Sequence, residues 1–68
     1  MKTLHHDTEF DNAMLFYHYV MVMKEGKMIG GGLIEAYNDY EIQIGNKLYA
    51  RENTSFIEAP APQAPISL

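Results

Sequence analysis

The amino-acid sequence predicts an all-β fold, a small five-stranded antiparallel meander that forms a partly open barrel. Two observations support this prediction. Runs of aromatic and β-branched residues, such as FYHYVMV and YEIQI, have the composition of strands. Turn signals at Asn38–Asp39, Gly45–Asn46 and Asn53–Thr54 separate these runs at short intervals. With 68 residues, the chain forms one small domain at most.

The chain divides into three segments by composition. Residues 1–12 are polar and are predicted to be a flexible or short helical N-terminal segment, in which Asp7 caps a helical turn running to Met14. Residues 13–58 are predicted to form the single small β-barrel domain. Residues 59–68 hold all three prolines and are predicted to be a disordered, extended tail, because proline fixes φ and lacks a backbone donor.

The first strand is predicted over residues 13–24, AMLFYHYVMVMK. Its aromatic and β-branched residues favour a strand, whereas Ala13, Met14 and Leu15 mildly favour a helix. Apolar residues are nearly continuous here, so periodicity does not separate a buried strand from a buried helix. A helix over residues 12–24 therefore stays open as the alternative.

Four further strands are expected, each bounded by turn residues. Gly26 supplies the positive φ that a tight hairpin needs after the first strand. The run from Tyr40 to Ile44 alternates apolar and polar side chains, as a half-buried strand does. The predicted strands cover residues 28–37, 40–44, 47–52 and 55–59.

Three consecutive glycines, Gly30–Gly32, lie inside the second predicted strand. A glycine in a strand interior is unfavourable by roughly 0.5–1 kcal/mol relative to alanine. A phosphate-binding loop would place the glycines before a helix, often with a lysine. The residues that follow, LIEAY, supply neither. The run instead predicts the corner of a barrel, where a strand coils and its neighbours come close.

The order of hairpin, glycine bend and short strands resembles the small SH3-like and Sm-like barrels in architecture. The resemblance covers residues 13–58 and includes no motif that is diagnostic of either family. It implies a partly open barrel and carries no functional residue over to this chain.

Composition and charge limit the class of protein. The chain has no cysteine, which excludes disulfides and thiolate metal sites. A net charge of −4 with five Lys and Arg residues disfavours direct nucleic-acid binding, which needs a basic patch. No segment approaches the roughly 20 apolar residues of a membrane helix. Residues 1–12 lack the apolar region of a secretory signal. We therefore expect a cytoplasmic protein.

The residues with catalytic or metal-binding chemistry are scattered. Neither serine, Ser55 or Ser67, neighbours a histidine in the sequence. His5, His6 and Asp7 are consecutive, but neighbouring side chains of an extended chain point to opposite sides. We expect no enzymatic activity, no metal and no cofactor.

The first predicted strand is apolar on both faces. One face carries Phe16, His18, Val20 and Val22, and the other carries Leu15, Tyr17, Tyr19, Met21 and Met23. A small protein cannot pack both faces on one core, and tyrosine and methionine are typical of protein interfaces. We predict that Tyr17, Tyr19, Met21 and Met23 form a protein interface. The alternative is a long, strongly bent strand that serves two parts of one barrel. Tyr37 and Tyr40, which flank the Asn38–Asp39 turn, are a second candidate contact.

These observations predict a small acidic, non-enzymatic protein-interaction module that self-associates and binds, inhibits or regulates another protein. Short acidic chains of this kind are typical of bacterial and phage accessory proteins. One alternative is a nucleic-acid-binding barrel that gathers Lys24, Lys27, Lys47 and Arg51. Another is an inhibitor of a host enzyme whose acidic surface imitates nucleic acid, and its residues would be Glu35, Asp39, Glu41, Glu52 and Glu58.

Overall fold

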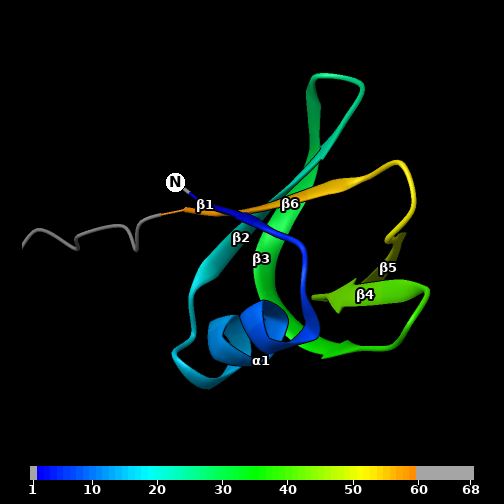
Figure 1. Ribbon diagram of the computed structural model, residues 1–68. Helices are drawn as coiled ribbons and strands as arrows, with labels where there is room; N and C mark the ends of the chain where they lie inside the picture. Colours follow the sequence, from blue (N-terminus) through cyan, green and yellow to red (C-terminus); the bar gives the residue numbers. More distant parts are fainter. Residues whose placement is uncertain (1, 60–68) are drawn as a thin grey trace, which may run out of the picture.

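The computed structural model describes residues 2–59 and contains one antiparallel sheet and one helix (Figure 1). The elements are β1 (Lys2–Leu4), α1 (Asp7–Leu15), β2 (Tyr19–Lys24), β3 (Lys27–Tyr37), β4 (Glu41–Ile44), β5 (Lys47–Ala50) and β6 (Ser55–Glu58). The strand order is β1-β6-β2-β3-β4-β5, so β1 and β5 are edge strands and the barrel is open between them. The all-β prediction is confirmed, with six strands in place of five.

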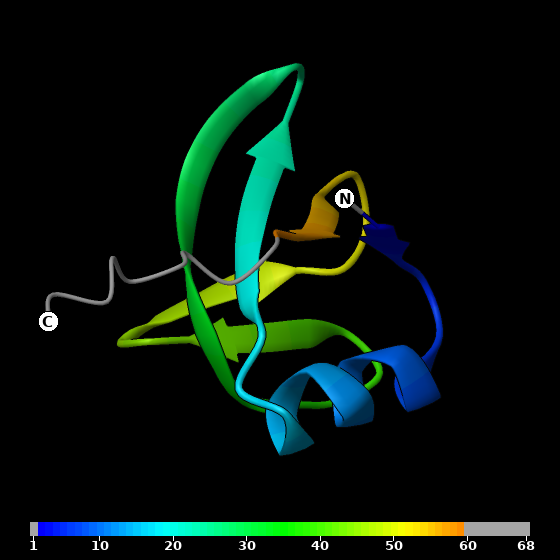
Figure 2. The same cartoon turned by 90° about the vertical axis from the view of Figure 1, so that its left-hand side faces the viewer.

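The sheet is strongly curved, and α1 lies at the opposite end of the molecule from the β2–β3 hairpin (Figures 1 and 2). Nine apolar residues from the helix and five strands form the core. They are Leu4, Phe10, Ala13, Val20, Val22, Ile34, Ile42, Ile44 and Phe56. Within residues 2–59, no helix has the length and apolarity to cross a bilayer.

The N-terminal segment belongs to the folded domain, which the sequence analysis placed at residues 13–58. Leu4 of β1 and Phe10 of α1 are 3% and 2% exposed. β1 pairs with β6, where Leu4 lies opposite Phe56, and the Phe10 ring packs edge-on against Phe56 at 5.9 Å. The polar segment therefore contributes two core side chains. The tail predicted over residues 59–68 lies outside the described residues, apart from Ala59.

The strand predicted over residues 13–24 is wrong for its first six residues, and so is the helical alternative for its last six. α1 runs through Leu15, and β2 begins at Tyr19. The helix ends because the His18 amide donates to the Ala13 carbonyl at 2.9 Å and the Tyr17 amide donates to the Met14 carbonyl at 3.3 Å. This pair of bonds is the Schellman C-cap, with Tyr17 at the left-handed position (φ 55°) that glycine usually occupies.

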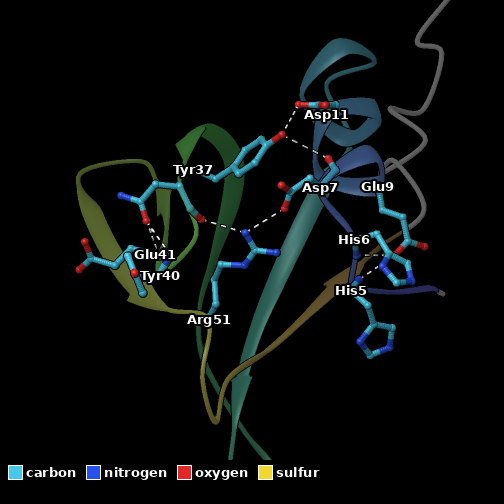
Figure 3. A network of polar contacts seen from close by, with 10 residues as sticks. His5, His6, Asp7, Glu9, Asp11, Tyr37, Tyr40, Glu41 and Arg51 are labelled. Atoms are coloured by element: carbon cyan, nitrogen blue, oxygen red, sulfur yellow. Dashed lines mark hydrogen bonds and ion pairs between the residues drawn. The ribbon is translucent and has the colours of Figure 1, made fainter.

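The N-cap of α1 is His6, one residue before the predicted Asp7. The Glu9 carboxylate accepts hydrogen bonds from the His5 and His6 amides at 2.7 and 2.9 Å (Figure 3). Lys2 Nζ lies 3.4 Å from the same carboxylate. These backbone bonds, with the Lys2 charge, lower the pKa of Glu9 from 4.5 to about 2. Glu9 thus ties the start of α1 to β1.

Acid should weaken the fold through Glu9. Because its pKa is lower in the folded protein, the bonds to His5 and His6 contribute stability that is complete above pH 4.5 and is lost as the pH falls toward 2. We expect Glu9→Gln to flatten the pH dependence of the free energy of unfolding in this window, as measured by urea denaturation at successive pH values. An unchanged pH dependence would contradict the assignment.

The glycine run lies where β3 changes partner, as the corner prediction requires. The first part of β3 pairs with β2 up to Leu33, and the last part pairs with β4 from Ile34 onward. A Cβ atom on Gly30 would lie 2.8 Å from Cζ of Tyr49 and still closer to its hydroxyl. A Cβ atom on Gly32, which has a φ of +152°, would lie 3.2 Å from Ile44 Cγ2. The missing side chains let β4 and β5 fold over the inside of β3.

Gly30→Ala should destabilise the protein by about 1–3 kcal/mol, because the new methyl group occupies the place of the Tyr49 ring. The smaller side chain in Tyr49→Leu removes that clash at the cost of core packing. Urea denaturation of both single variants and the double variant measures the coupling between the two positions. We expect the double variant to lose less unfolding free energy than the two single variants lose together. Additive effects would show that Tyr49 is not the constraint.

Candidate interaction surface

Over residues 19–23, one face of β2 is fully buried and the other is partly exposed. Val20 and Val22 point into the core and are fully buried. Tyr19, Met21 and Met23 lie on the opposite face, as the sequence predicted for these three residues. Tyr19 is 37% exposed, and the two methionines are half-buried. The alternation of a strand therefore separates a core face from a face turned toward solvent.

The neighbouring strands extend this solvent-facing surface. Tyr19 lies opposite Leu33 of β3, Met21 lies between Gly31 of β3 and Ile57 of β6, and Met23 lies opposite Met28. Residues directly opposite in a sheet share a face. We call this surface the outer face. Its large side chains are Tyr19, Met21, Met23, Met28, Leu33 and Ile57.

Gly31 shapes the middle of the outer face. A Cβ atom there would lie 2.9 Å from Tyr19 Oη, 3.1 Å from Tyr19 Cε1 and 3.2 Å from Met28 Cε. The Tyr19 ring and the Met28 side chain therefore lie close beside the bare backbone of Gly31, which itself stays exposed. An aromatic ring over a strand glycine is a known way of pinning the register of a sheet. It also makes this part of the outer face apolar and without a projecting side chain from β3.

A second apolar surface lies where α1 ends. Three consecutive large side chains are exposed there: Leu15 by 68%, Phe16 by 61% and Tyr17 by 76%. We call these three residues the apolar corner. Beside them lies an open groove of about 520 Å³ between α1 and β3. The residues lining the groove are Ala13, Met14, Tyr17, Gly32, Leu33, Ile34, Glu35, Gly45 and Asn46. Leu33 thus borders both the groove and the outer face.

Tyr37 and Tyr40 do not form one aromatic site. The Tyr37 ring packs against Phe10 at 5.7 Å, and its hydroxyl donates to Asp11 Oδ1 at 2.5 Å. Tyr40 is 78% exposed, and its amide donates to Asn38 Oδ1 at 2.8 Å in the β3–β4 turn. Figure 3 shows the Tyr37 ring directed toward Asp11 and α1. Tyr37 therefore attaches the helix to the sheet.

Arg51 completes this attachment (Figure 3). Its Nη1 donates to the Asn38 carbonyl at 2.8 Å and lies 3.0 Å from Asp7 Oδ1. The guanidinium also lies over the Phe10 ring at 4.9 Å, and its side chain is only 20% exposed. No local sequence pattern predicts this cluster, because its members come from α1, the β3–β4 turn and the residue after β5.

The remaining candidate residues lie apart from one another. His18 Nδ1 lies 2.6 Å from Glu58 Oε1, which joins the start of β2 to the end of β6. In the described part of the chain, no three His, Cys, Asp or Glu side chains lie close enough to hold a metal ion. Ser55 is exposed on β6, and Ser67 lies outside the described residues.

Sequence reasoning missed half of the outer face. Met28, Leu33 and Ile57 belong to other strands than the predicted interface residues, and only the pairing register brings them beside β2. Leu15 and Phe16 were both assigned to a strand, in which Leu15 shared the face of Tyr17 without being named as an interface residue and Phe16 lay on the opposite face. The signal for the outer face that the sequence contained was the alternation of side chains between the two strand faces over residues 19–23.

No protein-family model matches this chain, and comparison with curated proteins and with solved structures finds no match either. The surfaces described above are therefore interpreted from their own chemistry.

The ionisation of Tyr37 tests the attachment of α1. The hydrogen bond to Asp11, its burial and the Asp11 charge raise the pKa of Tyr37 from 10.0 to about 12. The associated stability is therefore complete below pH 10 and is lost as the pH rises toward 12. Asp11→Asn should move this pKa back toward 10, as followed by NMR titration of the Tyr37 ring carbons. The Tyr40 ring in the same spectra is the control. An unchanged Tyr37 titration would contradict the role of Asp11.

Proposed function

We propose that this chain is a small acidic, non-enzymatic protein-interaction module that self-associates through the outer face. One observation carries the proposal. The side chains of the outer face are apolar or tyrosine, and the pairing register places them beside one another on β2, β3 and β6, with the exposed charged residues of these strands, Lys24, Lys27 and Glu35, beyond its two ends. Contiguous apolar surfaces of this kind on small proteins mark sites of contact with other proteins.

The composition of the outer face suits an interface. Tyrosine and methionine are enriched in protein interfaces, and methionine side chains adapt to an irregular partner surface. The face is built on paired strands, so its backbone is held in place before a partner arrives. A fixed backbone reduces the entropy that association costs.

Charge supports a second copy of this chain as the partner. Each copy has a net charge of −4, so two copies repel one another at most relative orientations. None of the six side chains of the outer face is charged. Contact through this face keeps the like charges of the two copies at its margin. A twofold dimer would place the same surface on both sides, with about 800 Å² buried per copy in a stable complex.

The alternative functions receive less support. A nucleic-acid site needs accessible cations, whereas Arg51 is engaged by Asp7 and the Asn38 carbonyl. Lys24 and Lys27 lie opposite one another beside the β2–β3 hairpin turn, at the other end of the molecule from α1 (Figure 1), whose Asp7 contacts Arg51. An acidic imitation of nucleic acid would use Glu58, whose carboxylate is paired with His18.

Tyr19→Asp should prevent self-association, because it places a charge at the contact and removes an aromatic side chain. The loss of a central aromatic residue of an interface corresponds to about 2 kcal/mol or more, or a dissociation constant about 30-fold higher. Sedimentation equilibrium over a concentration series measures the effect, and circular dichroism verifies the fold.

Tyr40→Asp is the matched control, since Tyr40 is exposed but lies outside the outer face. It should leave the dissociation constant unchanged. A wild-type chain that stays monomeric at every concentration would refute self-association. Equal effects of the two variants would show that the outer face is not the contact.

A further inference from the structure

The apolar corner holds a residue whose conformation does not suit its side chain. Tyr17 has a φ of 55° at the helix C-cap, where glycine incurs no steric penalty. The Tyr17 side chain is 76% exposed, so it adds little to the core. The fold would accept a glycine here at least as well. A strained residue with an exposed aromatic ring points to a binding role for that ring.

The groove beside Tyr17 has the character of a peptide site. Met14 and Tyr17 come from the end of α1, and Leu33 and Ile34 come from β3 on the other side. Among the lining residues within 2–59, Glu35 alone is charged. An extended apolar segment with few charges fits such a groove, and proline-rich segments are bound by grooves that contain aromatic rings.

The end of β6 delivers the following chain to this place. The Ala59 amide donates to the Tyr19 carbonyl at 2.9 Å, so the last described residue lies beside the first residue of β2. Leu33 lies opposite Tyr19 on the other side of β2. Two strand spacings, ~10 Å, therefore separate Ala59 from the Leu33 side of the groove.

Residues 60–68 have the sequence PAPQAPISL, with three prolines, Ile66, Leu68 and no charged side chain. Nine residues in the polyproline conformation span ~28 Å, which exceeds the distance to the groove. Proline limits the freedom of the unbound segment, so its ordering costs less entropy than that of other sequences. Attachment to the same chain gives it an effective concentration in the millimolar range.

We propose that residues 60–68 of this chain bind in the groove between α1 and β3, with their prolines against the Tyr17 ring. The segment is an intrachain ligand that covers the apolar corner. This site is distinct from the self-association surface and does not depend on it, although Leu33 lies at the border of both.

The test uses the full chain and NMR contacts between side chains. We expect nuclear Overhauser contacts from the Pro62, Pro65 and Ile66 side chains to the Leu33 methyl groups and the Tyr17 ring. Tyr17→Gly should abolish these contacts without lowering the melting temperature, because glycine suits the left-handed C-cap. A lower melting temperature would refute the view that the ring is dispensable to the fold.

Two further variants separate the site from general effects. Replacement of Pro62 and Pro65 by alanine together should also remove the contacts, since the segment loses its preferred extended conformation. Tyr40→Gly removes an exposed tyrosine of the β3–β4 turn and should leave the contacts of residues 60–68 intact. Contacts that survive both Tyr17→Gly and the double proline replacement would refute the proposal.

A mixture of isotope-labelled and unlabelled copies identifies the source of the segment. Intrachain binding gives contacts within labelled copies only, and their intensity per molecule does not change with protein concentration. Contacts between labelled and unlabelled copies would replace the intrachain site with an exchange between copies. The complete absence of contacts to Leu33 and Tyr17 would refute the site. Self-association is measured separately by sedimentation. The two proposals are therefore tested by different measurements, and the failure of one does not affect the test of the other.

Discussion

The close approach of side chains to the bare backbone at Gly30–Gly32 is the constraint on which this fold depends. Tyr49 and Ile44 reach β3 from inside at Gly30 and Gly32, and the Tyr19 ring approaches it from outside at Gly31. One strand of 11 residues can then pair with β2 in its first part and with β4 in its second. Without that bend, β4 and β5 could not close over the small core, because side chains on β3 would occupy their space.

The helix depends on a second set of contacts, which is polar. Asp7 and Asp11 of α1 meet Arg51 and Tyr37, and Phe10 packs beneath the guanidinium. These contacts fix α1 at one end of the sheet (Figure 2). The same placement presents the exposed residues Leu15, Phe16 and Tyr17 at the last turn. The contacts that stabilise the position of the helix therefore also determine where the apolar corner is exposed.

The two proposed contacts divide the exposed apolar surface between them. In a chain of net charge −4, charge keeps copies apart except where a surface is uncharged. The outer face is uncharged, so we propose that a second copy binds there. The groove has one charged residue among its described lining residues, so we propose that residues 60–68, which carry no charged side chain, bind there. Both proposals follow from a small core that leaves large apolar side chains outside it.

The sequence by itself determined the all-β fold, the corner at Gly30–Gly32 and the turns at Asn38–Asp39 and Gly45–Asn46. It also determined which side chains of β2 share a face. These properties follow from local preferences of the chain, namely glycine conformations, turn residues and the two-residue period of a strand.

Only the tertiary structure decided that residues 2–4 form a strand, since Lys2–Leu4 are extended by pairing with β6, more than 50 residues away. It likewise decided where α1 ends within a continuous apolar run and that Tyr37 turns toward Asp11. Such features depend on partners distant in sequence, and no local pattern specifies those partners.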